Sequence, residues 1–215
     1  MKLGILSDTH DLLRMEVLHA LSGADVILHA GDICSEKILE RLSAIAPTHA
    51  VRGNADKAWA EHLPAELDLV LGEIRVFMTH KKKDLPEDLS PYDLVICGHS
   101  HQYLESRLGG TVFLNPGSCG PRRFHQAITL AVADVSGRDI NVHRIDIAHA
   151  LPKTVPDADV RSQIEAVVKA TQKGVSPSEI ARKHGWDPDM CEQIARLYVT
   201  HPGVTVDGIM WKMGI

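Results

Sequence analysis

The stretch Val95-Ile-Cys-Gly-His-Ser-His101 (VICGHSH) leaves an apolar run through a glycine and then presents two imidazoles one residue apart. In an extended chain, residues i and i+2 point to the same side. We therefore expect His99 and His101 to converge on one region, just beyond a strand over residues 93–99. What those two side chains bind decides how the rest of the sequence is interpreted.

Polar side chains follow four other strand-like runs in the same way. These runs are 2–7, 25–30, 48–53 and 66–80, the last with a turn near Gly72, and they lead into SDTH (7–10), HAGD (29–32), RGNAD (52–56) and TH (79–80). Ligand sites of α/β proteins gather at the carboxyl ends of such strands. The candidate ligands are Asp8, His10, Asp32, Asn54, His80, His99 and His101.

This donor set indicates a metal site. Oxygen and imidazole ligands without a thiolate suit Mn²⁺, Fe, Zn²⁺, Co²⁺ or Ni²⁺. The set is larger than one ion needs, whereas two ions that share a carboxylate would use all of it.

The remaining patterns predict an α/β sandwich of mixed sheets flanked by helices, over residues 1–150. Helical patterns over 11–21 and 35–45 separate the first three strands. Later runs over 102–117, 127–135 and 139–147 indicate hairpins, the first with its turn at Gly109-Gly110. Early β-α alternation followed by hairpins favours mixed rather than purely parallel sheets.

After a proline-containing linker over 148–159, the sequence predicts a small all-α module over 158–215. Helical patterns cover roughly 158–173, 177–184 and 188–200, before a short ending that includes Trp211. Residues 177–194 resemble a helix-turn-helix, with Gly185 in the turn and Ala181, Trp186, Cys191 and Ile194 facing inward. Its second helix carries Asp187, Asp189 and Glu192, which would repel phosphates, so we expect interaction or homo-oligomerisation rather than DNA binding.

Composition bounds the function further. The net charge of −5 argues against a dedicated nucleic-acid binder, and no apolar run approaches membrane-spanning length. The opening MKLGILSD shows no secretory leader, so we expect a cytoplasmic protein. The four cysteines form no CxxC pair, which favours reduced and mostly buried thiols over disulfides.

The order D-x-H, GD, GN-x-D, TH and GH-x-H, followed by Asn115-Pro-Gly-Ser118, resembles the calcineurin-like metallophosphoesterase superfamily and its small YfcE-type phosphodiesterase branch, over about residues 1–145. The resemblance implies two divalent ions, Mn²⁺ first among the candidates. It assigns one ion to Asp8, His10, Asp32 and His101, and the other to Asn54, His80, His99 and a bridging Asp32.

It also implies hydrolysis of a small phosphodiester by a metal-bridging hydroxide. Asp32 and Asn54 would act in catalysis, and Arg52, Lys81 and Arg122 (beside Arg123) are candidates to hold phosphoryl oxygens, although these cations could be plain surface charge. Ala55 stands where many larger relatives carry a histidine. His29 matches no ligand position, which favours a supporting or structural role.

Two alternatives stay open. One is a phosphomonoesterase. The other is a non-catalytic scaffold on the same fold, similar to the retromer scaffold subunit, whose metal set is eroded; the complete ligand set here argues against it.

Overall fold

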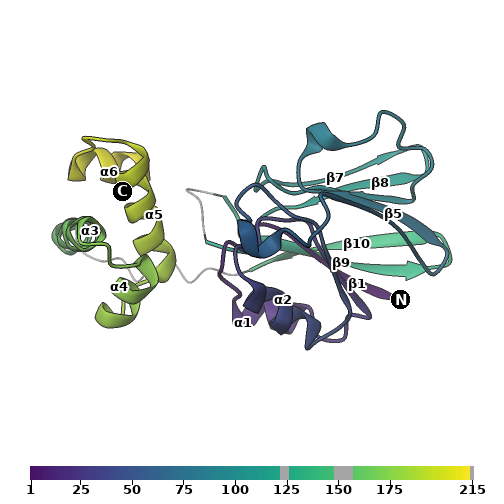
Figure 1. Ribbon diagram of the computed structural model, residues 1–215, viewed down its shortest axis with the longest axis horizontal. Helices are drawn as coiled ribbons and strands as arrows, with labels where there is room; N and C mark the ends of the chain where they lie inside the picture. Colours follow the sequence, from purple (N-terminus) through teal and green to yellow (C-terminus); the bar gives the residue numbers. More distant parts are fainter. Residues whose placement is uncertain (122–125, 148–156, 214–215) are drawn as a thin grey trace. The chain divides into compact units, whose positions relative to one another are not determined.

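The computed structural model describes residues 1–121, 126–147 and 157–213, and the chain divides into two compact units. The first unit comprises residues 1–120 and 127–147 and contains both β-sheets, whereas the second contains the helices that follow residue 156 (Figure 1).

The first unit is built on two five-stranded mixed sheets. The first sheet has the order β10-β9-β1-β2-β3, in which β1 (Lys2–Leu6), β2 (Val26–His29) and β3 (Thr48–Ala50) are parallel, and β9 (Thr129–Ser136) and β10 (Asp139–Asp146) form an antiparallel hairpin. The second has the order β4-β5-β6-β8-β7. In it β5 (Ile74–Thr79), β6 (Leu94–Ile96) and β8 (Thr111–Pro116) are parallel, flanked by antiparallel β4 (Glu66–Leu71) and β7 (Tyr103–Leu108).

The two sheets bury their facing apolar residues against each other. Leu3, Ile5 and Leu28 of the first sheet pack in one cluster with Val76 and Ile96 of the second. Helices α1 (Met15–Ala20) and α2 (Glu36–Ser43) cover the other face of the first sheet. The predicted sandwich of mixed sheets is therefore confirmed. The outer face of the second sheet is covered differently, by a segment that includes the 3₁₀ helix η2 (Lys82–Asp84) and contributes Leu85, Leu89 and Tyr92. A second 3₁₀ helix, η1, spans Ala58–Ala60.

Several elements are shorter than their sequence patterns. The helix expected over 11–21 begins only at Met15, because His10 and Asp11 have positive φ, outside the right-handed helical region, and their N–H groups bond to the carbonyls of Asp32 and Ile33. The strand expected over 93–99 ends at Ile96, so the GHSH residues lie in a loop. Both differences place polar residues in loops at the sheet edge.

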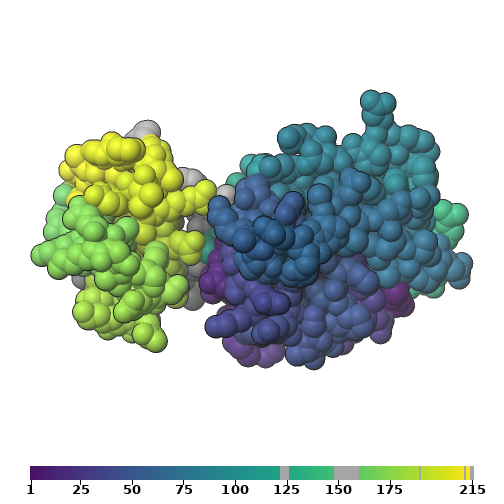
Figure 2. Space-filling model, viewed as in Figure 1, coloured from purple at the N-terminus to yellow at the C-terminus, as the bar shows by residue number. Residues whose placement is uncertain are grey.

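The second unit is a helical bundle with its own core. It consists of α3 (Asp157–Gln172), α4 (Pro177–His184), α5 (Pro188–Thr200) and α6 (Val206–Met213), and its side chains pack into one body (Figure 2). Gly185 joins α4 to α5 in the left-handed conformation, and Ala181, Cys191 and Ile194 are buried as the sequence predicts. The sequence pattern missed α6. Most of the expected linker over 148–159 lies outside the described residues.

The described part of the chain contains no helix with the length and apolarity needed to span a bilayer. All four cysteines are free thiols, three of them buried, as predicted, and Cys34 half-buried.

Candidate functional site

Six of the predicted ligands meet beyond the carboxyl ends of β1, β2, β5 and β6. They form two groups of three, Asp8 with His10 and His101, and Asp32 with His80 and His99. Within each group, one potential ligand atom per residue lies within 4.8 Å of the others. His99 and His101 thus reach one region but belong to different groups.

The first group has the spacing of ligands around one ion. The Nε2 atom of His101 lies 3.0 Å from Oδ1 of Asp8 and 3.4 Å from Nε2 of His10. Two ligand atoms that each lie about 2.1 Å from the same ion are separated by about 3.0–3.4 Å. Oδ1 of Asp8 is buried and makes no hydrogen bond, which leaves its lone pairs directed at this point.

Asp32 joins the two groups. Its Oδ1 atom lies 3.4 Å from Nε2 of His80, and its Oδ2 atom lies 3.8 Å from Nε2 of His10. Nδ1 of His80 is 2.7 Å from the carbonyl of Ala30, and donation of its proton there leaves Nε2 as a lone-pair donor. That Nε2 atom is buried without a hydrogen bond. The donors present therefore fit two cations of the kind that oxygen and imidazole ligands select.

The backbone of the site is strained. Asp8, His10, Asp32, His99 and His101 all have positive φ, between 45° and 70°. Such a conformation costs an L-residue roughly 1–2 kcal/mol, and it persists only where the surroundings enforce it. It also corrects the reason for the convergence of His99 and His101. We expected strand alternation to direct both side chains, but a left-handed loop does so and sends them to separate groups.

Two glycines make room for the carboxylates. A Cβ atom on Gly98 would lie 2.0 Å from Oγ of Ser7 and 2.9 Å from Oδ2 of Asp8. A Cβ atom on Gly53 would lie 2.2 Å from Oδ1 of Asp32. Because neither position can hold a side chain, both loops approach the carboxylates with bare backbone, and the N–H of His99 donates to Asp8 at 3.0 Å.

The Asn115-Pro-Gly-Ser118 segment holds these loops in place. The buried Asn115 side chain donates to the carbonyl of Gly98 at 2.8 Å and accepts from the N–H of Gly117 at 3.0 Å. Ser118 Oγ donates to the carbonyl of Asp8 at 3.0 Å. The family element noticed in the sequence is thus a support for the loops that carry His99 and Asp8.

Sequence reasoning assigned no role to Asp56, which connects two loops of the site. Its Oδ1 atom accepts from the N–H groups of Ile33 and Cys34 at 2.9 and 2.7 Å, and its Oδ2 atom accepts from Gly53 N–H at 2.7 Å. The loop after β2, which carries Asp32, is thereby tied to the loop after β3. The only sequence feature that pointed to Asp56 was its place as the last residue of the GNAD motif (53–56).

His29 has a supporting role, as its position before the GD motif suggested. Nδ1 accepts from the N–H of Gly31 at 3.2 Å, and Nε2 lies 3.0 Å from Oγ1 of Thr9. Complete burial lowers the pKa of His29 to about 3, so the ring is neutral at physiological pH. It connects the loops after β1 and β2 behind the ligand groups.

Burial and neighbouring charges shift the pKa values of the ligand candidates. Burial raises the pKa of Asp8, but the nearby His101, the hydroxyl of Ser7 and the charge of His80 together hold the pKa below its usual value. Burial lowers the pKa of His80, but its contact with Asp32 and the charge of Asp8 raise it overall. For the exposed His99, burial of part of the ring and the charges of His80 and Lys81 lower the pKa.

The other predicted site residues are less enclosed. Asn54 and Arg52 are exposed in the loop after β3, and among the described residues neither side chain makes a hydrogen bond or ion pair. Lys81 is half-buried and close enough to influence His99 electrostatically. Ala55 donates its N–H to Oδ1 of Asp32 at 2.7 Å. Arg122 and Arg123 lie outside the described residues, and the phosphate-binding roles of all these cations stay predictions.

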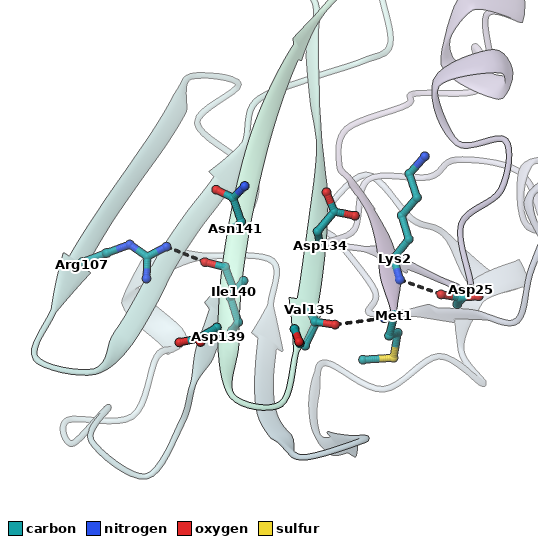
Figure 3. A pocket seen from close by; sticks show the side chains of 10 residues that line it. Met1, Lys2, Asp25, Arg107, Asp134, Val135, Asp139, Ile140 and Asn141 are labelled. Atoms are coloured by element: carbon teal, nitrogen blue, oxygen red, sulfur yellow. Dashed lines mark hydrogen bonds between the residues drawn. The ribbon is translucent and has the colours of Figure 1, made fainter.

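A surface depression of about 560 Å³ lies at the amino end of β1, lined by Met1, Lys2, Asp25 and Asp134 among others (Figure 3). Asp8 and His10 follow the carboxyl end of the same strand, and the residues that line this depression include none of the candidate ligands.

Two relatives align with just over half of the chain. The chain is 33% identical over 132 residues to a probable metallophosphoesterase of Methanothermobacter thermautotrophicus, in an alignment covering 55% of this chain and 77% of the relative. It is 31% identical over 145 residues to phosphodiesterase YfcE of Escherichia coli, covering 55% of this chain and 79% of YfcE.

Solved structures agree. A solved structure of YfcE, a phosphoesterase from Escherichia coli, matches with a TM-score of 0.53 and 26% identity, covering 69% of this chain and 100% of YfcE. Zinc-bound Vps29 of Entamoeba histolytica matches with a TM-score of 0.54 at 20% identity, covering 68% of this chain and 99% of Vps29, which shows the shared fold alone. The calcineurin-like phosphoesterase superfamily domain itself matches residues 1–138, well over half of the sequence. The chain therefore belongs to the calcineurin-like phosphoesterase superfamily, and its named relatives are consistent with the YfcE-type branch.

Proposed function

We propose that the first unit is a dinuclear-metal phosphodiesterase that hydrolyses small phosphodiesters. The observation that carries the proposal is the position of Asp32, whose two oxygens face the two groups of potential ligands. The Nε2 atom of His80 is buried and makes no hydrogen bond. A site for one ion would leave this atom without a ligand role, whereas a second ion would use it.

Asp8, His10, His101 and one oxygen of Asp32 would hold one ion, and His80, His99, Asn54 and the other oxygen would hold the second. Mn²⁺ is the first candidate, and Fe, Zn²⁺, Co²⁺ and Ni²⁺ suit the same donors. When bound, such ions lower the pKa of a coordinated water toward about 7 and neutralise phosphoryl charge. The half-buried His10 and the exposed His99 leave one side of the two groups open to a substrate.

The residues around that open side select the reaction. Lys81, next to His80 and electrostatically coupled to His99, provides a positive charge for the substrate phosphate. Arg52, exposed with its guanidinium unpaired among the described residues, can provide another. Ala55 cannot donate a proton to the leaving group. Substrates with good leaving groups are therefore favoured, and the likeness to relatives named as phosphodiesterases supports phosphodiesters over monoesters.

The test compares Asp32→Asn with the wild type. Metal content is measured after loading with Mn²⁺, and hydrolysis is measured on bis-p-nitrophenyl phosphate. We expect the variant to lose at least one metal equivalent and more than about 100-fold in kcat/KM, because removal even of residues that merely support ligands costs 10–100-fold. Asp139→Asn, which changes an exposed carboxylate of β10, is the matched control. Two bound metals and a near-normal rate in Asp32→Asn would falsify the dinuclear assignment.

The two alternatives give different results in the same assays. A non-catalytic scaffold with these ligands would bind metal but would hydrolyse neither the diester nor the monoester p-nitrophenyl phosphate. A phosphomonoesterase would hydrolyse p-nitrophenyl phosphate faster than the diester.

A further inference from the structure

The outermost strand of the second sheet, β7, has a free edge. It pairs with β8 on one side, and no described strand pairs with it on the other. Residues 104–108 (LESRL) are all exposed, and its two leucines are among the most exposed large apolar residues of the chain, Leu104 at 46% and Leu108 at 73%. An edge strand of this kind is a template for pairing with another strand.

The hairpin turn determines which backbone groups are available. Gly109 and Gly110 form a two-residue turn, so Leu108 and Thr111 close the hairpin as a hydrogen-bonded pair. In an antiparallel ladder, hydrogen-bonded residues alternate. Leu104, Ser106 and Leu108 therefore bond to β8, and the N–H and carbonyl groups of Glu105 and Arg107 point away from it, toward the free edge.

The sequence at that edge is complementary to itself. We propose that β7 pairs antiparallel with β7 of a second copy of this chain, about a two-fold axis at Ser106. This register places Glu105 opposite Arg107 of the second copy, twice by symmetry, and Leu104 opposite Leu108. The residues whose backbone groups are free face each other, so the ladder hydrogen bonds form in the same register that pairs the charges.

Neighbouring registers lack this match. A shift by one residue places a residue whose N–H and carbonyl groups point to the free edge opposite a residue whose groups already bond to β8, so ladder hydrogen bonds cannot form. The other registers of correct alternation nearest to it place Glu105 opposite Glu105, or Arg107 opposite Arg107, and like charges directly opposite each other destabilise a sheet. Only the register about Ser106 satisfies both the backbone and the charges.

Within one chain these charges are not paired. Arg107 donates to the backbone carbonyl of Ile140 in β10 at 2.6 Å, and Glu105 accepts from the hydroxyl of Tyr103 at 3.0 Å (Figure 3 shows the Arg107 contact). Neither side chain forms an ion pair with any residue that the structure describes. Each therefore retains its charge for an opposite charge from a second copy.

The leucines add apolar contact on the outer face of the sheet. Leu104, Ser106 and Leu108 share that face with Phe113, the cross-strand neighbour of Ser106. One pair of six-residue strands buries less than a standard interface of about 1,200–2,000 Å². The expected dimer is therefore weak, with a dissociation constant on the order of 10 μM.

A charge swap on the full-length chain tests the register. Sedimentation equilibrium over a concentration series should show a reversible dimer for the wild type. Glu105→Arg and Arg107→Glu should each raise the dissociation constant about tenfold or more, because two attractive pairs become repulsive. The double variant, with the charges exchanged, should return to within about threefold of the wild type. Lys37→Glu, an exposed charge reversal in α2, is the control and should change nothing.

A cysteine scan tests the axis. Ser106→Cys should form a disulfide-linked dimer under mild oxidation, since residues facing each other across a two-fold axis in a non-hydrogen-bonded pair have Cα atoms about 4.5 Å apart, within disulfide reach. Leu108→Cys lies opposite Leu104 instead and should form none. A wild-type chain that stays monomeric to about 500 μM overturns the proposal. So does a dimer that Glu105→Arg leaves intact, or equal cross-linking through positions 106 and 108.

Discussion

Replacing Asn115 with alanine would remove the side chain that holds the histidine loop. Asn115 is 4% exposed, and its side chain makes four hydrogen bonds, to Gly98 O at 2.8 Å, to Ser100 Oγ at 3.1 Å, to Cys97 Sγ at 3.8 Å and from Gly117 N at 3.0 Å. These bonds join the loop after β6 to the segment after β8. The loop must be held, because His99 and His101 both have strained, left-handed backbones.

The expected loss of stability follows from the partners left behind. The carbonyl of Gly98 still accepts from Ser100 N–H, so its lost bond costs about 1 kcal/mol. The buried N–H of Gly117 loses its side-chain acceptor, which costs about 1–3 kcal/mol. The hydroxyl of the exposed Ser100 can bond to water instead. The free energy of unfolding of the first unit should therefore fall by about 2–4 kcal/mol.

Urea unfolding of the metal-free chain measures this loss, fitted with two transitions because the chain has two units. Mn²⁺ affinity should also fall, by about 10–100-fold, as it does when partners of ligands are removed. Ser100→Ala, which removes only the exposed hydroxyl, should cost less than about 0.5 kcal/mol. If Asn115→Ala unfolds within about 1 kcal/mol of the wild type and binds Mn²⁺ equally well, other contacts hold the loop and the reasoning is wrong.

Three further predictions follow from other parts of the first unit. Hydrolysis rates of aryl and alkyl phosphodiesters should depend steeply on leaving-group pKa. Ala55→His should flatten that dependence, since general-acid help is worth about 10²–10⁴-fold for poor leaving groups. A flat dependence in the wild type would show that another residue, with Lys81 as the first candidate, already donates the proton. Burial lowers the pKa of His29 from 6.5 to about 3. Between pH 6.5 and pH 3, His29 is therefore protonated in the unfolded chain but neutral in the folded chain. The free energy of unfolding of the metal-free protein should therefore fall by about 1.4 kcal/mol per pH unit from pH 6.5 down toward pH 3, and His29→Asn, which keeps an acceptor for Gly31 N–H, should weaken this slope in urea titrations at pH 7, 6 and 5. A chain ending at residue 147 should fold and bind metal, because every candidate ligand precedes that point; a soluble, metal-loaded but inert truncation would assign part of the active site to the C-terminal unit.

The donor types and their order along the chain were readable from the sequence, because each followed an apolar strand. The strand pattern also predicted the mixed sheets correctly. The same pattern gave a wrong local reason for His99 and His101, since apolarity does not show where the backbone leaves the extended conformation. Strand β6 ends at Ile96, and the backbone turns left-handed at His99.

Residues that act through backbone contacts were harder to predict. Asp56 and Asn115 each hold N–H or carbonyl groups from segments far apart in the chain, and such pairings depend on the tertiary fold. Periodicity carries no information about them. Helix α6 was missed for a related reason, because it is short, contains Gly208 and is stabilised by packing against the other helices.

The positive φ angles at the ligand positions lower the stability of the fold, yet those positions carry the side chains that can bind metal. At His99, exposed and with φ of 70°, glycine would be the residue that best suits the backbone, yet glycine offers no ligand. Selection for thermal robustness alone would thus erode this site one residue at a time. A lineage that no longer needs metal ligands at these positions would gain stability by replacing them.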